Sequence, residues 1–546
     1  MTEFAVPEDP MQTTRTRPIR NWLAALACGA MLAAGAPVLA QGGGFAQAVA
    51  QLSAGDRALA AYYKAADYGA LWTGRGNRER QRVRELMAAL DNAGAQGLPA
   101  GRYDAAGLKA MAASARSEAD LAKLEVAYSK AFLAYVHDVQ SGILTPRRVA
   151  AGIERDAPRR DPARTLAAFA RSSPSAFIAA LPPQTAEYAA LLSEKARLER
   201  LAGGNGWGPK VQASALQKGQ SSPAVAQMSA RLAAMGYGRS GGAAYGDSVV
   251  QQVAAFQRDH GLAPDGVAGK GTIAEINEEP EDRLASVLAA MERERWMNFP
   301  LGKRHIWVNI PDFTAKIVDS GKVTLSTRSV VGQNQPSHRS PEFSDVMEYM
   351  VINPTWNVPR SIVVNEYLPM LKSNPNAAGQ LQLIDQSGRS VSRGSVNFAS
   401  YDASNFPYGL KEPPSTGNAL GTVKFMFPNP YNIYLHDTPS KSLFGRESRA
   451  YSHGCIRLAD PHDFAYALLA QQTRDPKGFF QSQLATGRET TVHLEHPVPV
   501  HIVYRTAFAP DARGGAFQYR RDVYGRDAAV YSALAKAGVS IRGIRG

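Results

Sequence analysis

The 546-residue sequence has only two cysteines, Cys28 and Cys455. Loss of the N-terminus would leave one thiol, which excludes an internal disulfide. The sequence also lacks any block of five or six consecutive basic residues, although its 61 Lys and Arg outnumber its 48 Asp and Glu. The resulting net charge of +13 is scattered and has no aromatic interleaving. This pattern favours an anionic partner and argues against nucleic acid.

Long apolar runs are absent after the first 40 residues, so a later membrane span is not expected. Basic residues precede an apolar run at 22–40, which ends in Val38-Leu39-Ala40. This order is typical of a secretory signal peptide at 1–40, and it predicts export to the periplasm or cell envelope. A retained segment would anchor the chain to the membrane. Acidic residues near Met1 are unusual in such a signal, which makes Met11 an alternative start.

Hydropathy periodicity divides the remaining chain. Residues 41–205 carry apolar residues at helical spacing, as in Val83, Leu86, Met87 and Leu90, and predict a helical scaffold domain. Residues 213–277 predict a small three-helix bundle. From about residue 300 the period changes to two, as in Ile306, Val308 and Ile310, which predicts strands.

The strand-rich part is predicted to span 300–508, with a C-terminal extension at 509–546. Its stretch at about 360–418 is rich in Pro, Gly, Ser and Asn, and we interpret it as a lid insert. The expected fold is therefore multidomain α+β, with a mostly-β domain following two helical units.

The strongest chemical signal is the segment Tyr451-Ser452-His453-Gly454-Cys455-Ile456-Arg457. A thiol becomes a strong nucleophile as thiolate, and a nearby imidazole or positive charge lowers its pKa. Gly454 leaves room beside the sulfur, and backbone N–H groups there would stabilise an oxyanion. Arg457 would lie on the same side as Cys455 in an extended segment.

The second half of the pattern is Tyr434-Leu435-His436-Asp437. His436 precedes Cys455 by nineteen positions, which is enough chain for a loop to bring the imidazole to the sulfur. A papain-like order, with Cys before His, is not met. Zinc binding by His436, His453 and Cys455 is the alternative for these residue types, but further close-spaced ligands are missing.

These segments resemble the catalytic motif of the L,D-transpeptidase family, a histidine followed by Ser-His-Gly-Cys and then Arg or Asn. Further segments of the sequence are similar to the larger Gram-negative members of that family, including Asn353–Pro359, Asn418–Gly421 and His436–Ser440. Met235-Gly236-Tyr237, Phe256–Leu262 and Asp265–Gly269 resemble the peptidoglycan-binding domain type 1. The stretch from Glu412 to Gly417 departs from the family pattern, which leaves the lid contacts open.

The resemblance implies a role for each matched residue. Cys455 is the nucleophile, His436 its base, and the carbonyl of Asp437 orients the imidazole. The N–H groups of Gly454 and Cys455, with the Tyr434 hydroxyl, form the oxyanion site. The implied substrate-binding residues are His453, Arg457, Trp356, Asn357 and Ser452. No metal and no cofactor are implied.

The implied reaction joins peptidoglycan stem peptides through a cysteine thioester on a tetrapeptide stem, giving 3→3 cross-links. An L,D-carboxypeptidase would use the same acyl-enzyme with water as acceptor. A non-catalytic protein that binds wall glycan and peptide is the third possibility. The acyl acceptor stays open between a second stem, a free D-amino acid and a lipoprotein lysine, and the oligomeric state also stays open.

Overall fold

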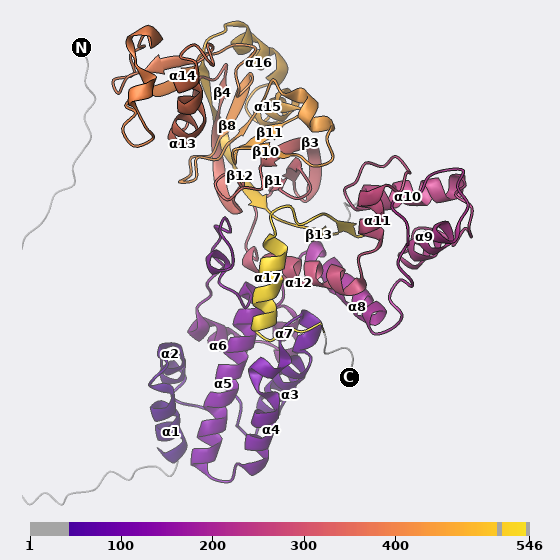
Figure 1. The fold of residues 1–546 in the computed structure, drawn as a ribbon. Helices are drawn as coiled ribbons and strands as arrows, with labels where there is room; N and C mark the ends of the chain where they lie inside the picture. The colour runs from indigo at the N-terminus through magenta and orange to yellow at the C-terminus, as the bar shows by residue number, and fades with distance from the viewer. Residues whose placement is uncertain (1–42, 510–515, 542–546) are drawn as a thin grey trace, which may run out of the picture.

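The computed structural model describes residues 43–509 and 516–541. The predicted signal segment at 1–40 lies outside this part of the chain. No helix within the described residues is long and apolar enough to cross a membrane. A long helical region, a small bundle to its side and a sheet domain follow one another (Figure 1). The arrangement confirms the predicted multidomain α+β class.

The N-terminal helical region is built around an aromatic core. The ring of Trp72 lies 5.5 Å from that of Phe132 and 5.2 Å from that of Phe169. Ser117 and Asp120 form a capping box that satisfies backbone N–H groups at the start of the longest helix. The elements are α1 (Gly43–Ser53), α2 (Arg57–Ala65), α3 (Asn77–Asp91), η1 (Ala93–Gln96), η2 (Ala100–Tyr103), α4 (Ala105–Ser114), α5 (Glu118–Ser141), η3 (Pro146–Arg148), α6 (Pro162–Arg171) and α7 (Pro174–Ala179).

A second helical core joins segments that are distant in sequence. It packs α8 (Ala186–Ala202), α12 (Pro280–Trp296) and α17 (Arg526–Lys536) together with strands β13 (Ala507–Phe508) and β14 (Gln518–Tyr519). Arg293 of α12 is buried and pairs with both Glu342 and Asp527. Removing one partner of such a buried pair is costly, so these contacts tie α12 to the sheet domain and to α17. The described part of the 509–541 segment thus packs into the body of the protein.

The bundle consists of α9 (Pro223–Ala234), α10 (Asp247–Asp259) and α11 (Lys270–Ile276). Its core holds the apolar side chains whose helical spacing marked them in the sequence, among them Val225, Met228, Leu232 and Phe256. Gly236 lies in the turn that follows α9 and has φ of +100°, a conformation that glycine adopts at low cost.

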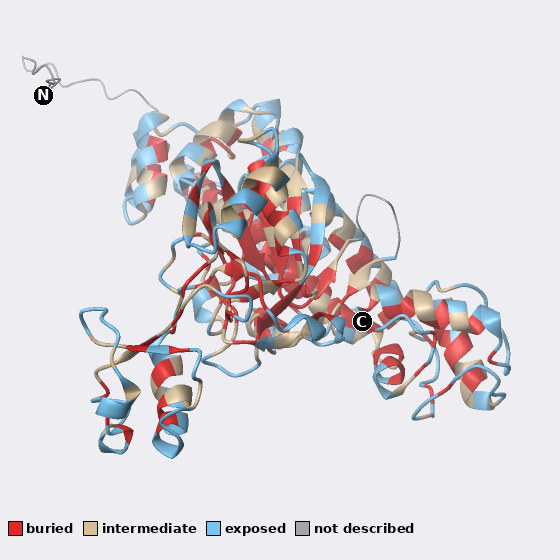
Figure 2. Cartoon of the chain, turned by 90° about the horizontal axis from the view of Figure 1, so that it is seen from above, coloured by how far each residue is buried: buried red, intermediate tan, exposed pale blue. Residues whose placement is uncertain are grey.

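The sheet domain is built on nine strands in the order β10-β3-β11-β9-β8-β4-β12-β1-β2, and β2 also pairs with β3. The sheet therefore closes on itself, and its buried residues gather at the centre (Figure 2). Its elements are β1 (Arg304–Asn309), β2 (Thr314–Asp319), β3 (Lys322–Gly332), β4 (Phe343–Ile352), β8 (Val423–Met426), β9 (Leu435–His436), η7 (Lys441–Gly445), β10 (Ala450–Ser452), β11 (Ile456–Leu458), α15 (Pro461–Leu469), α16 (Pro476–Ala485) and β12 (Thr490–Val503).

The insert between β4 and β8 folds as a small unit with its own apolar core, which includes Val363, Leu371, Leu383 and Phe398. It contains β5 (Trp356–Asn357), α13 (Arg360–Ile362), the π-helical turn η4 (Val363–Tyr367), α14 (Leu368–Ser373), β6 (Gln382–Ile384), η5 (Arg393–Ser395), η6 (Phe398–Ser400) and β7 (Gly409–Glu412). Its separate core allows this unit to keep its own shape beside the sheet domain.

Candidate active site

The histidine and cysteine segments lie on neighbouring parallel strands. Ile456 of β11 pairs with Leu435 of β9, and Arg457 pairs with His436. Leu435 and Ile456 are fully buried in the sheet core. Side chains alternate along a strand, so His436 and Arg457 share the opposite face. Cys455 directly precedes β11 and belongs to the same face as Arg457.

A tight turn presents Cys455. Gly454 before it has φ of +111°, where a side chain would be strained and would meet the Ile433 Cδ1 at 3.2 Å. The Ser452 hydroxyl donates to the Cys455 carbonyl at 2.5 Å and accepts from the Gly454 N–H at 3.2 Å. The Ser340 hydroxyl donates to the Gly454 carbonyl at 2.6 Å. These bonds fix the direction of the sulfur.

Two expectations from the sequence change as a result. Ser452 was predicted to bind substrate, but it is buried and its hydroxyl is occupied within the turn. Its contacts make it a positioning residue. The Gly454 N–H was predicted to stabilise an oxyanion, but it already donates to Ser452. The oxyanion donors that remain from the expected set are the Cys455 N–H and the Tyr434 hydroxyl.

The Cys455 thiol is partly accessible, and its sulfur lies 3.5 Å from the Asn432 carbonyl. Burial raises the pKa of the thiol to about 11, although hydrogen bonds with Tyr434 and the charge of Arg457 oppose this rise. The sequence predicted a lowered pKa, because it revealed the charged neighbours but not the desolvation. The Tyr434 hydroxyl is itself hydrogen-bonded to the Trp356 side chain, which brings β5 of the insert into the site.

The imidazole of His436 is buried and held in one orientation. Its Nδ1 lies 2.5 Å from the Asp437 carbonyl oxygen, which can only accept, so Nδ1 carries the proton. Burial, followed by the charge of Arg457, lowers the pKa of His436 to about 3. The ring is therefore neutral at pH 7, and its Nε2 is free to accept a proton.

A second layer of contacts holds Asp437. Its carboxylate accepts from the Thr422 N–H at 2.9 Å, from the Thr422 hydroxyl at 2.8 Å and from Lys441 Nζ at 2.5 Å. Burial raises the pKa of Asp437, but the bonds from Lys441 and Thr422 outweigh it and leave the pKa lowered. Gly421 has φ of +62°, and a Cβ there would lie 2.3 Å from the Asp437 carboxyl group. Sequence reasoning missed Thr422 and Lys441 as site residues.

Arg457 supplies the positive charge of the site. The nearby carboxylate of Asp460 accepts from the Thr327 hydroxyl at 2.8 Å. The Arg457 Nε is buried and has no hydrogen-bond partner among the described residues. Burial lowers the pKa of this guanidinium, and the charge of an ionised Cys455 opposes the fall. Arginine keeps its positive charge in proteins. A cation in this state favours an anionic group of a ligand.

The insert closes onto the cysteine turn through Glu366 of η4. Glu366 Oε1 lies 2.7 Å from His453 Nε2 and 3.9 Å from His338 Nε2. The ligand atoms of these three residues all lie within 4.8 Å of one another, so the group could also hold a divalent cation. Asn357, the remaining predicted substrate residue, is exposed and pairs with Lys411 in the insert sheet. The structure does not bring it into contact with Cys455.

Comparison with known families adds an independent result. Residues 303–492 match the L,D-transpeptidase catalytic domain, residues 221–276 a "putative peptidoglycan binding domain", and residues 57–194 a scaffold domain. A Haemophilus influenzae protein described as a "putative L,D-transpeptidase" is 32% identical over 244 residues. The match spans 44% of this chain and 47% of that protein, about half the length of each.

An L,D-transpeptidase crystal structure from Xylanimonas cellulosilytica (residues 123–326) matches with 14% identity. The match covers 53% of this chain and 98% of that one, at a TM-score of 0.17, which supports no structural conclusion. The family matches rest on the residue ranges given above and do not depend on this crystal structure. The chain thus carries an L,D-transpeptidase catalytic domain at 303–492 and a peptidoglycan-binding domain at 221–276.

Proposed function

We propose that this protein is an exported L,D-transpeptidase that forms 3→3 cross-links between peptidoglycan stem peptides through a thioester on Cys455. One observation carries the proposal: a neutral imidazole, fixed by the Asp437 carbonyl, lies on the strand next to the cysteine and shares its face. Domains that act on the cell wall imply that the enzyme works outside the cytoplasm.

Acylation begins when His436 Nε2 takes the thiol proton as the sulfur attacks the carbonyl of the L-centre of diaminopimelate. The Cys455 N–H and the Tyr434 hydroxyl stabilise the oxyanion. The protonated imidazole then gives its proton to the leaving D-alanine amine, and a thioester remains. Arg457 attracts a carboxylate of the donor stem.

Deacylation uses the side-chain amine of a second stem, which attacks the thioester carbonyl and gives its proton to His436. The carbon–sulfur bond then breaks, and the proton returns from His436 to the Cys455 sulfur. The acyl bond is conserved in the thioester, so no ATP is required. Water would give a trimmed tripeptide instead, as in an L,D-carboxypeptidase. The insert contacts the site through Trp356 and Glu366, and a closed insert limits the access of water.

The test is to incubate the purified protein with tetrapeptide stems and to separate the products by liquid chromatography and mass spectrometry. The proposal expects dimers with release of D-alanine, and none with Cys455→Ala. Tyr431→Phe serves as a matched control, since its hydroxyl contacts Glu154 and not the sulfur. Tripeptides as the only product would favour the carboxypeptidase. If neither protein forms a product and Cys455→Ala binds the cell wall as the unaltered protein does, only a wall-binding function remains.

A further inference from the structure

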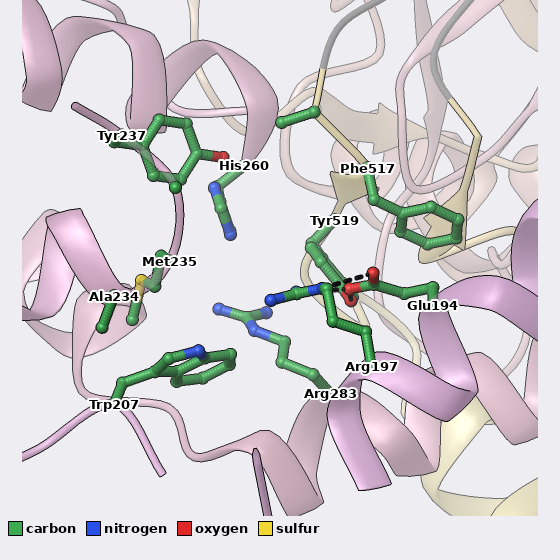
Figure 3. A pocket seen from close by; sticks show the side chains of 12 residues that line it. Glu194, Arg197, Trp207, Ala234, Met235, Tyr237, His260, Arg283, Phe517 and Tyr519 are labelled. Carbon is green, nitrogen blue, oxygen red and sulfur yellow. Dashed lines mark hydrogen bonds and ion pairs between the residues drawn. The ribbon is translucent and has the colours of Figure 1, made fainter. Parts of the chain in front are cut away.

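A cavity of about 300 Å³ lies where the small bundle meets helices α8 and α12 and strand β14. Figure 3 shows its lining side chains converging from these elements. Half of its twelve lining residues are aromatic or, in the case of Met235, sulfur-bearing, and none of the twelve belongs to the site around Cys455. The side chains used in the argument are Trp207, Met235, Tyr237, His260, Arg283 and Tyr519.

Trp207 gives the cavity an unsatisfied donor. The residue is 5% exposed, and its indole Nε1 is buried without a hydrogen-bond partner among the described residues. A buried N–H without an acceptor is costly, and native proteins rarely keep one without a reason. Figure 3 shows the indole edge and the Arg283 guanidinium directed into the same space. An acceptor from a ligand would satisfy the indole N–H and lie beside the guanidinium.

His260 contributes an acceptor on another wall. Its Nδ1 lies 2.8 Å from the Phe256 carbonyl oxygen, so Nδ1 carries the proton. Burial, followed by the charges of Arg283 and Arg520, lowers the pKa of His260 well below its ordinary value. The neutral ring therefore offers Nε2 as an acceptor. It is stacked between Phe256 and Tyr519, at 3.8 and 5.5 Å between ring centroids.

More positive than negative side chains line the cavity. Two guanidinium groups line the cavity, those of Arg197 and Arg283, against one carboxylate, Glu194. Glu194 is occupied, because it accepts two bonds from Arg197, at 2.7 and 2.8 Å, and one from the Tyr519 hydroxyl. Arg283 pairs with Glu275, outside the cavity lining, and its guanidinium lies 4.8 Å above the Tyr519 ring.

We propose that this cavity is a second ligand site, which binds a carboxylate carried on a compact sugar or peptide body. The carboxylate accepts from the Trp207 indole N–H and from Arg283. A hydroxyl or amide N–H of the ligand donates to His260 Nε2, and the rings of Tyr237 and Tyr519 pack against its apolar face. The site goes beyond the proposed chemistry, because it holds ligand without Cys455 and links the bundle to α8 and α12.

The test is isothermal titration of the full chain with three probes. N-acetylmuramic acid carries a sugar carboxylate, D-alanyl-D-alanine carries a peptide carboxylate, and N-acetylglucosamine is the neutral control. We expect at least one carboxylate probe to bind and the neutral sugar not to bind. Trp207→Phe keeps the aromatic bulk but removes the N–H, and it should weaken binding about five- to tenfold. Arg283→Lys should weaken binding as well, because a point charge replaces the planar fork.

Cys455→Ala separates this site from the proposed active site and should bind the probe as the unaltered protein does. The proposal is overturned if no carboxylate probe binds, if N-acetylglucosamine binds equally well, or if binding is lost in Cys455→Ala. Unchanged affinity in folded Trp207→Phe also overturns it, and Arg283→Lys decides the question if the tryptophan variant does not fold. Failure of the proposed chemistry would appear separately, as absence of a covalent adduct on Cys455.

Discussion

Iodoacetamide should alkylate Cys455 slowly at neutral pH, because burial keeps the thiol neutral and the His436 imidazole is neutral as well. With the thiol pKa raised to about 11, roughly one molecule in 10⁴ is thiolate at pH 7. An ordinary cysteine, with a pKa of about 8.5, is about 3% ionised. At pH 7 the ionised fraction of an ordinary cysteine is therefore about 300 times that of Cys455. The greater nucleophilicity of a more basic thiolate recovers about tenfold, so alkylation should be about 30-fold slower than that of a free cysteine.

The assay is the alkylation rate between pH 6 and pH 9, followed by mass spectrometry with peptide mapping, which separates Cys455 from Cys28. The expected profile rises about tenfold per pH unit without a plateau, because the pKa lies above the range. His436 is neutral throughout this range, since burial lowers its pKa to about 3. A plateau between pH 6 and pH 8 would refute the reasoning, because it would reveal a preformed thiolate–imidazolium pair.

Three further variants test separate parts of the structure. Tyr434→Phe removes the hydroxyl that bonds to the sulfur, and acylation should fall about 10²-fold, while Tyr431→Phe leaves it unchanged. Gly454→Ala forces a side chain into φ of +111°, at a cost of about 1–3 kcal/mol, and thermal unfolding and acylation rates should both report it. Glu125→Ala removes a buried carboxylate that accepts from three backbone N–H groups, and urea unfolding should show a loss of about 3 kcal/mol.

Each of the last two variants has a matched control in the chain. Gly445→Ala places a methyl group in open space, so acylation and thermal unfolding should stay unchanged. Asp91→Ala removes an exposed carboxylate that pairs with Lys109, and its cost should stay below about 1 kcal/mol. A Glu125→Ala protein as stable as Asp91→Ala would contradict the account of the helical core. Normal acylation by Gly454→Ala would contradict the account of the cysteine turn.

The sequence was sufficient to predict the fold class, because periodicity reports local structure. Helical spacing in α9 and α10 and alternation in β1 correspond to the buried faces that the structure shows. The pairing of β9 with β11 depends on contacts that no local pattern encodes. The recurring motif, rather than the spacing of nineteen residues, pointed to His436 and Cys455 as one site.

The points at which the sequence predictions differ from the structure also have physical causes. Burial of the thiol depends on the whole domain, so charged neighbours alone gave the wrong direction for its pKa. The family resemblance implied substrate contact for Ser452, but its hydroxyl forms hydrogen bonds within the turn. Glu366 reaches His453 across about ninety residues of chain from an insert with its own core, and no sequence signal marked it.

The central claim is that Cys455 forms a covalent acyl-enzyme with the help of a neutral His436. The most direct measurement is the intact mass of the protein after incubation with a tetrapeptide stem or a carbapenem, followed by peptide mapping. The account predicts a single adduct on Cys455, which is absent in Cys455→Ala and forms far more slowly in His436→Ala. An unmodified protein, or an adduct on any other residue, would contradict it.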